Sequence, residues 1–190
     1  SSPYSASKAA SDHLVNAYYK TFGLPVTISN CSNNYGPYQF PEKFIPVIII
    51  NILQNKKIPV YGDGLNVRDW IHTEEHSHGI DLILQKGRVG ETYLLGVNGE
   101  QSNLDVVKKI LSILGKGEDQ IEFVKDRPGH DRRYAINSKK AEQELGFKPL
   151  YIFEDGLKQT VDWYLNNREW WERLLNKEYL KYYQDNYASK

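Results

Sequence analysis

The chain has 190 residues, of which 40% are hydrophobic, which is enough for one domain or slightly more around a real core. Basic and acidic residues both number 24, so the formal net charge is zero and we expect no surface for nucleic acid or acidic substrates. The single cysteine excludes an intrachain disulfide, and neither a signal peptide nor a membrane-spanning stretch is visible in these residues, so we expect a cytoplasmic protein that does not insert into a membrane.

The first predicted element is a helix over residues 5–22, which Gly23 and Pro25 end. Tyr4 and Lys8 stand at its start, four residues apart, so their side chains share one helix face. A cation beside a tyrosine hydroxyl stabilises the phenolate, which can then remove a proton from a sugar hydroxyl. The alternative is that this spacing is a chance feature of a helix surface.

A short β-branched run at 26–30 predicts a buried strand directly after that helix. A helix followed at once by such a strand is typical of a βαβ unit and indicates a parallel sheet, hence an α/β fold. Residues 31–38 then read as a polar loop at the carboxyl edge of the sheet, where open α/β folds bind ligands. The amides of Asn33 and Asn34 could contact a ligand there, or could simply form a turn.

A second helix is predicted from Pro41 to about Leu53, with Lys43 in its first turn, where free backbone N–H groups favour anions. Residues 58–61 and 68–71 read as strands. Arg68 on the second of them is a candidate for binding a phosphate through its planar guanidinium.

The segment from His72 to His76 matches the H-x-x-E-H pattern of one class of zinc protease. Two metal ligands at this spacing must lie within one helix. Thr73 looks like the N-cap of a helix that runs to about Lys86, so His72 falls before the helix and we expect no metal site.

Further along, strands are predicted at 90–95 and 120–124, with a helix over 103–114 between them. The loop 126–133 carries three arginines and a histidine around a Pro-Gly turn, which favours an anion site over a merely solvated loop. Two more helices are predicted, one capped by Ser138 and one over 153–166. We expect the tail to pack on its own domain through its apolar and aromatic residues, Trp170, Trp171, Leu174, Leu175, Tyr179, Tyr182, Tyr183 and Tyr187.

Five stretches together resemble the extended branch of the short-chain dehydrogenase/reductase superfamily, and within it the dTDP-glucose 4,6-dehydratases. They are Y-S-A-S-K at 4–8, N-C-S-N-N-Y-G-P-Y at 30–38, F-P-E-K-F-I-P at 40–46, R-D-W-I-H at 68–72 and D-R-P-G-H-D-R-R at 126–133. The resemblance extends from Ser2 to about Tyr164. The first stretch marks only the superfamily, whereas the second and the fifth are far more specific.

The resemblance implies the C-terminal part of an NAD-binding Rossmann fold, joined to a smaller α/β domain that binds a nucleotide sugar. Residues 1–35 would end the Rossmann domain, and 36–190 would mostly form the substrate domain, with elements at about 43–72 returning to the Rossmann sheet. It also implies a homodimer that associates through the helix of residues 5–22. The outer face of this helix carries Leu14, Tyr18 and Phe22, at i, i+4 and i+8.

By the same resemblance, Tyr4 is the general base that takes the C4 hydroxyl proton of dTDP-glucose while the C4 hydride passes to NAD. Lys8 binds the nicotinamide ribose and tunes the phenol, Asn34 contacts the nicotinamide, and Asn33 contacts the substrate. Water then leaves across C5 and C6 and the hydride returns to C6. The implied positions around the nucleotide and its diphosphate are Lys43, Phe44, Pro59, Val60, Tyr61, Arg68, Asn103, Asp126, Arg127, Pro128, Gly129 and His130.

Two parts of the family pattern are not found in these residues: the glycine-rich turn that cradles the pyrophosphate, and the acidic pair that eliminates water. We therefore expect the chain to be the C-terminal part of a longer protein and to be inactive alone. A UDP-sugar 4,6-dehydratase or a 4-epimerase of the same superfamily is the alternative within this class. A non-catalytic module for substrate binding or dimerisation is the alternative outside it.

Overall fold

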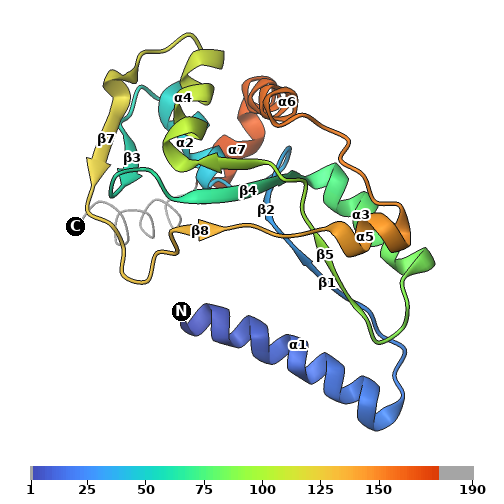
Figure 1. Ribbon diagram of the computed structural model, residues 1–190. Helices are drawn as coiled ribbons and strands as arrows, with labels where there is room; N and C mark the ends of the chain where they lie inside the picture. The colour runs from blue at the N-terminus through green and yellow to red at the C-terminus, as the bar shows by residue number, and fades with distance from the viewer. Residues whose placement is uncertain (1, 176–190) are drawn as a thin grey trace. The chain divides into compact units, whose positions relative to one another are not determined.

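The structure is a computed structural model that describes residues 2–175 (Figure 1). These residues form two compact units. The first unit contains residues 2–34, 66–101 and 128–153, and the second contains residues 35–65, 102–127 and 154–175. The chain leaves the first unit after residue 34 and returns to it at residues 66 and 128.

Helix α1 spans Pro3–Phe22, two residues longer at its start than predicted. The Ser2 hydroxyl accepts a hydrogen bond from the N–H of Ser5, and Pro3 supplies a preset φ in the first turn. Gly23, at φ 68°, ends the helix in the left-handed conformation that glycine adopts without strain. No residue of α1 is fully buried within the structure.

The first unit contains the predicted parallel pairing. Strand β1 (Ile28–Cys31) pairs in parallel with β5 (Thr92–Leu95), which confirms the parallel sheet. Figure 1 shows α1 on one side of this pair and helices α3 (Thr73–Lys86) and α5 (Lys139–Leu145) on the other. The core on the α3 and α5 side is made of Ile71, Leu82, Ile83, Tyr93, Leu95, Ala141, Leu145 and Phe147.

A second sheet contains three strands that the sequence did not reveal, β2 (Asn33–Tyr35), β6 (Glu100–Ser102) and β8 (Arg133–Tyr134). Its order is β2, β4 (Val67–His72) and β6, and β8 also pairs with β4. The prediction that 31–38 is entirely a loop was wrong, whereas the predicted loop 126–133 is irregular up to residue 132 and only Arg133 belongs to β8. Short polar strands of this kind have no apolar alternation and exist through their long-range partners.

The start of α3 differs from the prediction by one residue. His72, and not Thr73, is the N-cap: its ring accepts from the N–H of Glu74, and the Glu75 carboxylate accepts from the N–H of His72. This is a capping box with a histidine in the place of the usual serine or threonine. Because His72 precedes the helix that contains His76, the two imidazoles do not share a helix face.

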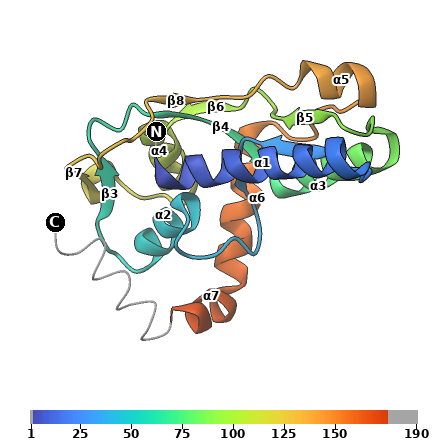
Figure 2. The same ribbon diagram turned by 90° about the horizontal axis from the view of Figure 1, so that it is seen from below.

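The second unit is built on a parallel pair with a helix before each strand. Strand β3 (Ile58–Tyr61) pairs with β7 (Ile121–Val124). Helix α2 (Phe44–Leu53) precedes β3, and α4 (Asn103–Ile113) precedes β7 through a short 3₁₀ turn, η1 (Glu118–Gln120). Helices α6 (Phe153–Asn166) and α7 (Arg168–Leu174) complete the described chain (Figure 2).

The described part of the tail packs partly inward, since Trp171 is fully buried and its indole N–H donates to the carbonyl of Tyr164. Tyr179, Tyr182, Tyr183 and Tyr187 lie outside the described residues. Among residues 2–175, no helix has both the length and the apolar character that a membrane span requires.

Candidate functional site

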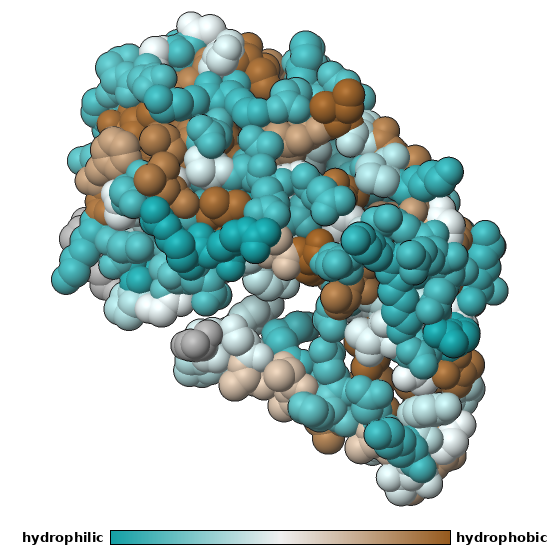
Figure 3. All heavy atoms as spheres, in the orientation of Figure 1, coloured by the Kyte–Doolittle hydropathy of each residue, from teal (hydrophilic) through white to brown (hydrophobic). Residues whose placement is uncertain are grey.

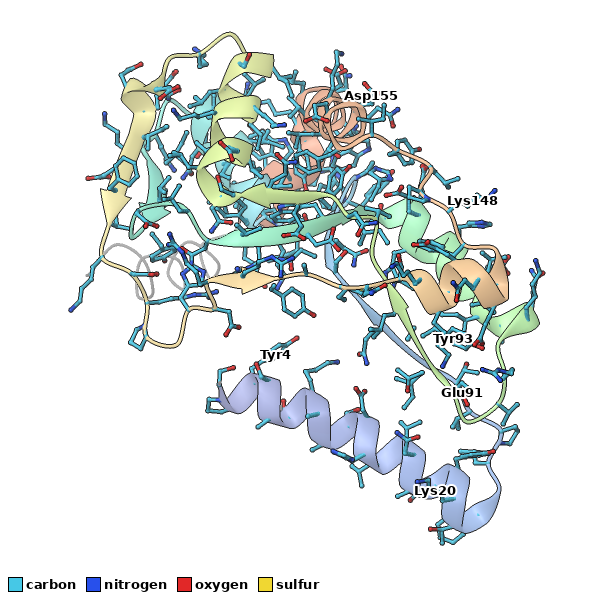
Figure 4. All side chains as sticks on the ribbon, viewed as in Figure 1. Tyr4, Lys20, Glu91, Tyr93, Lys148 and Asp155 are labelled. Carbon is cyan, nitrogen blue, oxygen red and sulfur yellow. The ribbon has the colours of Figure 1, made fainter. Side chains whose placement is uncertain are left out.

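The N-terminus of α1 brings the two predicted catalytic side chains to the carboxyl edge of β1. Since α1 leads directly into β1, the start of the helix lies at the end of the strand where ligands bind in α/β folds. Tyr4 and Lys8 occupy the first two turns, and 74% of Tyr4 is exposed. Figure 4 shows Tyr4 at this end of α1. The phenol is therefore open to a ligand and not used in packing.

Lys8 and Asn34 meet around the thiol of Cys31. The Asn34 amide donates to Cys31 Sγ at 3.2 Å and to the carbonyl of Ser32 at 3.3 Å. Burial raises the pKa of Cys31, and the Asn34 amide and the positive charge of Lys8 oppose that effect. Lys8 and Asn34 therefore both act on the charge of this thiol, which lies at the end of β1.

Tyr134 belongs to the same cluster, although the sequence analysis did not select it. Burial raises the pKa of Tyr134, and nearby Cys31 and Tyr4 raise it further. Tyr134 is therefore within electrostatic reach of Cys31 and Tyr4. The only signal in the sequence was its position directly after the charged loop 126–133, which does not distinguish a site residue from the end of a loop.

Arg68 lies next to this cluster through the pairing of two strands. Strand β4 pairs in parallel with β8, and Arg68 stands opposite Tyr134 in the register. The guanidinium is half-buried and donates from Nη1 to the carbonyl of Val67 at 2.7 Å. One terminal nitrogen of the guanidinium is therefore fixed by the backbone.

The residues of the loop before β8 differ in their exposure and in their partners. Pro128 and Gly129 are exposed, with Gly129 at φ 67°, and His130 is half-buried. Arg133, which the sequence suggested for an anion site, makes a bidentate ion pair with Glu100 at 2.7 and 2.8 Å. That pairing uses the fork of its guanidinium, so Arg133 is not available to a ligand phosphate.

The second unit gathers the remaining predicted residues at the carboxyl edge of its own parallel pair. Because α2 and α4 each lead into a strand of this pair, both helices begin at that edge. Lys43 and Phe44 start α2, and Asn103 starts α4. The edge also holds the end of β3, with Pro59, Val60 and Tyr61, and the residues after β7, Asp126 and Arg127.

Backbone hydrogen bonds connect the turn after β3 to the end of β7 and to the start of α4 within the second unit. The N–H of Gly62 donates to Val124 at the end of β7, and the N–H of Leu104 donates to the carbonyl of Gly64. A Cβ atom at Gly62 would lie 3.2 Å from Asp126 Oδ2, so the turn after β3 and Asp126 are in close approach. Lys43 Nζ forms an exposed ion pair with Glu42 at 2.9 Å. The edge therefore offers two helix N-termini and several polar side chains to an anionic ligand.

The residues of the first unit fit one end of a nicotinamide dinucleotide. A phenol, an ammonium and a carboxamide can hydrogen-bond a ribose and the nicotinamide carboxamide. The 190 residues contain no G-x-G-x-x-G sequence, so the backbone nest that binds the pyrophosphate is not among them. Residue types suited to the reactive end of such a cofactor are thus present in the first unit.

Residues 1–160 match the family described as GDP-mannose 4,6 dehydratase. The chain is 51% identical over 190 residues to a dTDP-glucose 4,6-dehydratase of Neisseria meningitidis serogroup B, covering 94% of this chain and 54% of that protein. It therefore spans about half the length of the curated relatives that it matches.

Two crystal structures are similar over most of this chain. One is a dTDP-glucose 4,6-dehydratase from Bacillus anthracis in complex with NAD, with a TM-score of 0.88 and 56% identity over 92% of this chain and 55% of that one. The other is DesIV, a dTDP-glucose 4,6-dehydratase from Streptomyces venezuelae with NAD and TYD bound, with a TM-score of 0.89 and 49% identity over 90% and 53% of the two chains. The predicted α/β fold class is confirmed.

Proposed function

The chain belongs to the GDP-mannose 4,6 dehydratase family, and we propose that the whole protein is a dTDP-glucose 4,6-dehydratase that uses NAD. The product would be dTDP-4-dehydro-6-deoxy-glucose. The observation that carries the proposal is the cluster at the carboxyl edge of β1, where Tyr4 and Lys8 lie by the segment that carries Asn33 and Asn34. About 50% identity to dTDP-glucose 4,6-dehydratases supports this choice among nucleotide sugars.

In the proposed reaction the exposed phenol of Tyr4 accepts the proton of the C4 hydroxyl. Lys8, one helical turn further on, stabilises the phenolate and binds the nicotinamide ribose. Asn34 would hold the nicotinamide carboxamide and Asn33 a sugar hydroxyl. When bound, NAD supplies the hydride chemistry, taking hydride from C4 and giving it back at C6. Oxidation at C4 acidifies the C5–H bond, so that water can leave across C5 and C6.

Each unit has polar residues suited to a nucleoside diphosphate. In the first unit these are Arg68 and the loop that carries Pro128, Gly129 and His130. In the second unit they are Lys43 and Phe44 at the start of α2, Pro59 to Tyr61 on β3, Asn103 on α4, and Asp126 with Arg127. Helix N-termini and guanidinium groups are the protein groups best suited to phosphate oxygens.

The 190-residue chain by itself is expected not to bind NAD measurably in isothermal titration calorimetry. It contains the residues for the nicotinamide end but no glycine-rich nest for the pyrophosphate, which supplies much of the affinity in dinucleotide sites. The whole protein, titrated or assayed for copurified NAD in the same buffer, is the control. Micromolar binding by the short chain would show that the placement of the cofactor is wrong.

The exposed face of α1 supports the proposed homodimer. Leu14, Tyr18 and Phe22 form one stripe and are 62%, 54% and 72% exposed. The rings of Tyr18 and Phe22 contact each other in a tilted arrangement, with centroids 5.3 Å apart. Asp12, whose carboxylate accepts from the Asn30 amide, and the half-buried Tyr19 lie on the face toward β1 and β5. Apolar (brown) side chains stand among polar ones along this helix in the lower part of Figure 3.

Tyr18→Glu in the whole protein is therefore expected to convert a dimer to monomers in sedimentation velocity, because it places a charge in the centre of the apolar stripe. Leu84→Glu is the matched control, since Leu84 is 82% exposed on α3 and outside this stripe. It should leave the mass unchanged. A dimer that persists in Tyr18→Glu would mean that α1 is not the interface.

A further inference from the structure

Asp69 is a fully buried carboxylate that lies where the chain passes twice from one sheet to another. Ser32 is the single residue between β1 and β2, and residues 96–99 lie between β5 and β6. On both segments the chain leaves the β1–β5 pair and joins the sheet that contains β4. Asp69 stands in the middle of β4 and therefore faces both crossings.

The contacts of Asp69 reach each crossing. Its Oδ1 accepts from the N–H of Gly99 at 2.8 Å. Its Oδ2 lies 2.7 Å from the position that a Cβ atom of Gly96 would take, so a side chain at residue 96 would displace the carboxylate. Burial raises the pKa of Asp69, and the N–H groups of Gly99 and Ile136 and the hydroxyl of Ser32 oppose that effect.

Ser32 is the polar group that turns toward Asp69 from the first crossing. It is 3% exposed, and its N–H donates to the carbonyl of Leu95. Among residues 2–175, neither Ser32 Oγ nor Asp69 Oδ2 makes a hydrogen bond of ordinary geometry to another group. A buried hydroxyl and a buried carboxylate that face each other compensate part of their mutual desolvation cost.

We propose that Asp69 is a positioning residue, which holds Asn33, Asn34 and Arg68 in register for the reaction. Its role in catalysis rests on the proposed function, because that function gives those three residues their tasks. Ser32 directly precedes Asn33, and the Asn34 amide donates to the Ser32 carbonyl, so a shift of Ser32 displaces both asparagines. Arg68 directly precedes Asp69 on β4, so a shift of the backbone at Asp69 also displaces Arg68.

The test uses Asp69→Asn in the whole protein. The substitution keeps the shape but replaces a charged acceptor by an amide, which weakens the bond from Gly99 and puts an N–H₂ group against one of the crossings. We expect kcat to fall at least about tenfold per folded molecule. We also expect the amide hydrogens of residues 32–34 and 97–99 to exchange with deuterium about tenfold faster or more.

Glu75→Gln is the matched control, because it makes the same chemical change at another buried carboxylate of the first unit. Glu75 is 1% exposed and accepts from the N–H groups of His72, Leu150 and Tyr151, far along the chain from both crossings. It should leave kcat per folded molecule within twofold and the exchange of residues 32–34 unchanged. A purely structural role for Asp69 would make the two variants alike.

Ser32→Ala keeps the test decisive if Asp69→Asn does not fold, since it removes only the hydroxyl. It should change kcat and exchange in the same direction by a smaller factor. Unchanged exchange at 32–34 in the folded variants, or an equal loss of kcat in Glu75→Gln, would overturn the proposal. The exchange measurement does not depend on the reaction. A wild-type protein without dehydratase activity would therefore refute the proposed function, whereas hydrogen exchange would still test whether Asp69 holds residues 32–34 in place.

Discussion

Tyr4→Phe in the whole protein is expected to lower kcat by about 10²–10⁴-fold, the usual contribution of a general acid–base group. The substitution removes only the hydroxyl that takes the C4 proton. Tyr4 is 74% exposed, and no packing depends on that hydroxyl within the structure, so folding should be unaffected. Single-turnover kinetics with saturating dTDP-glucose, together with circular dichroism, measures both quantities.

Tyr18→Phe is the matched control for this change. It removes the same atom from another exposed tyrosine of α1, away from the carboxyl edge of β1. Its kcat should stay within twofold of wild type. If Tyr4→Phe kept more than a tenth of the wild-type rate, the assignment of Tyr4 as the proton acceptor would fail.

Arg68→Ala is expected to raise KM for dTDP-glucose by roughly thirty- to a hundred-fold, because a charge-assisted hydrogen-bond pair is worth about 2–3 kcal/mol. The diphosphate is bound alike in the ground state and the transition state, so kcat should fall less than KM rises. Initial rates over a range of dTDP-glucose concentrations give both constants.

Arg88→Ala controls for the loss of an arginine charge from the first unit. Its guanidinium is engaged by Glu144 at 2.8 Å and lies outside the proposed site. An exposed pair of this kind contributes little, and KM should not change by more than twofold. A KM for Arg68→Ala within twofold of wild type would remove Arg68 from the diphosphate site.

The elements that the sequence predicted well are those with local signals. Helix α1 has a serine N-cap, a proline in its first turn and a glycine at its end, and β3 matches its predicted residues. Strands β2 and β8 were missed because Asn33–Tyr35 and Arg133–Tyr134 have no apolar alternation. Both depend on β4, which is more than 30 residues distant from either along the chain.

The candidate site was predictable where one element leads directly into the next. The order of α1, β1 and the Asn33–Asn34 segment places Tyr4, Lys8 and the two amides at one edge by topology alone. Pairings between distant segments could not be predicted in this way. The partner of Arg133 is Glu100, 33 residues earlier, and Tyr134 joins the cluster only through its pairing with β4. The role of Asp69 could not be predicted either, because Ser32 and Gly99, which act on its carboxylate, lie between strands that are distant from it along the chain.

The most direct test of the proposed function is the fate of deuterium placed at C4 of dTDP-glucose. The whole protein, incubated with this substrate and analysed by mass spectrometry and NMR, should form a product lighter by one water molecule. The deuterium should then be at C6, because the hydride taken from C4 returns there. A product of unchanged mass in which the deuterium is again at C4 would indicate a 4-epimerase and would contradict the assignment as a dehydratase.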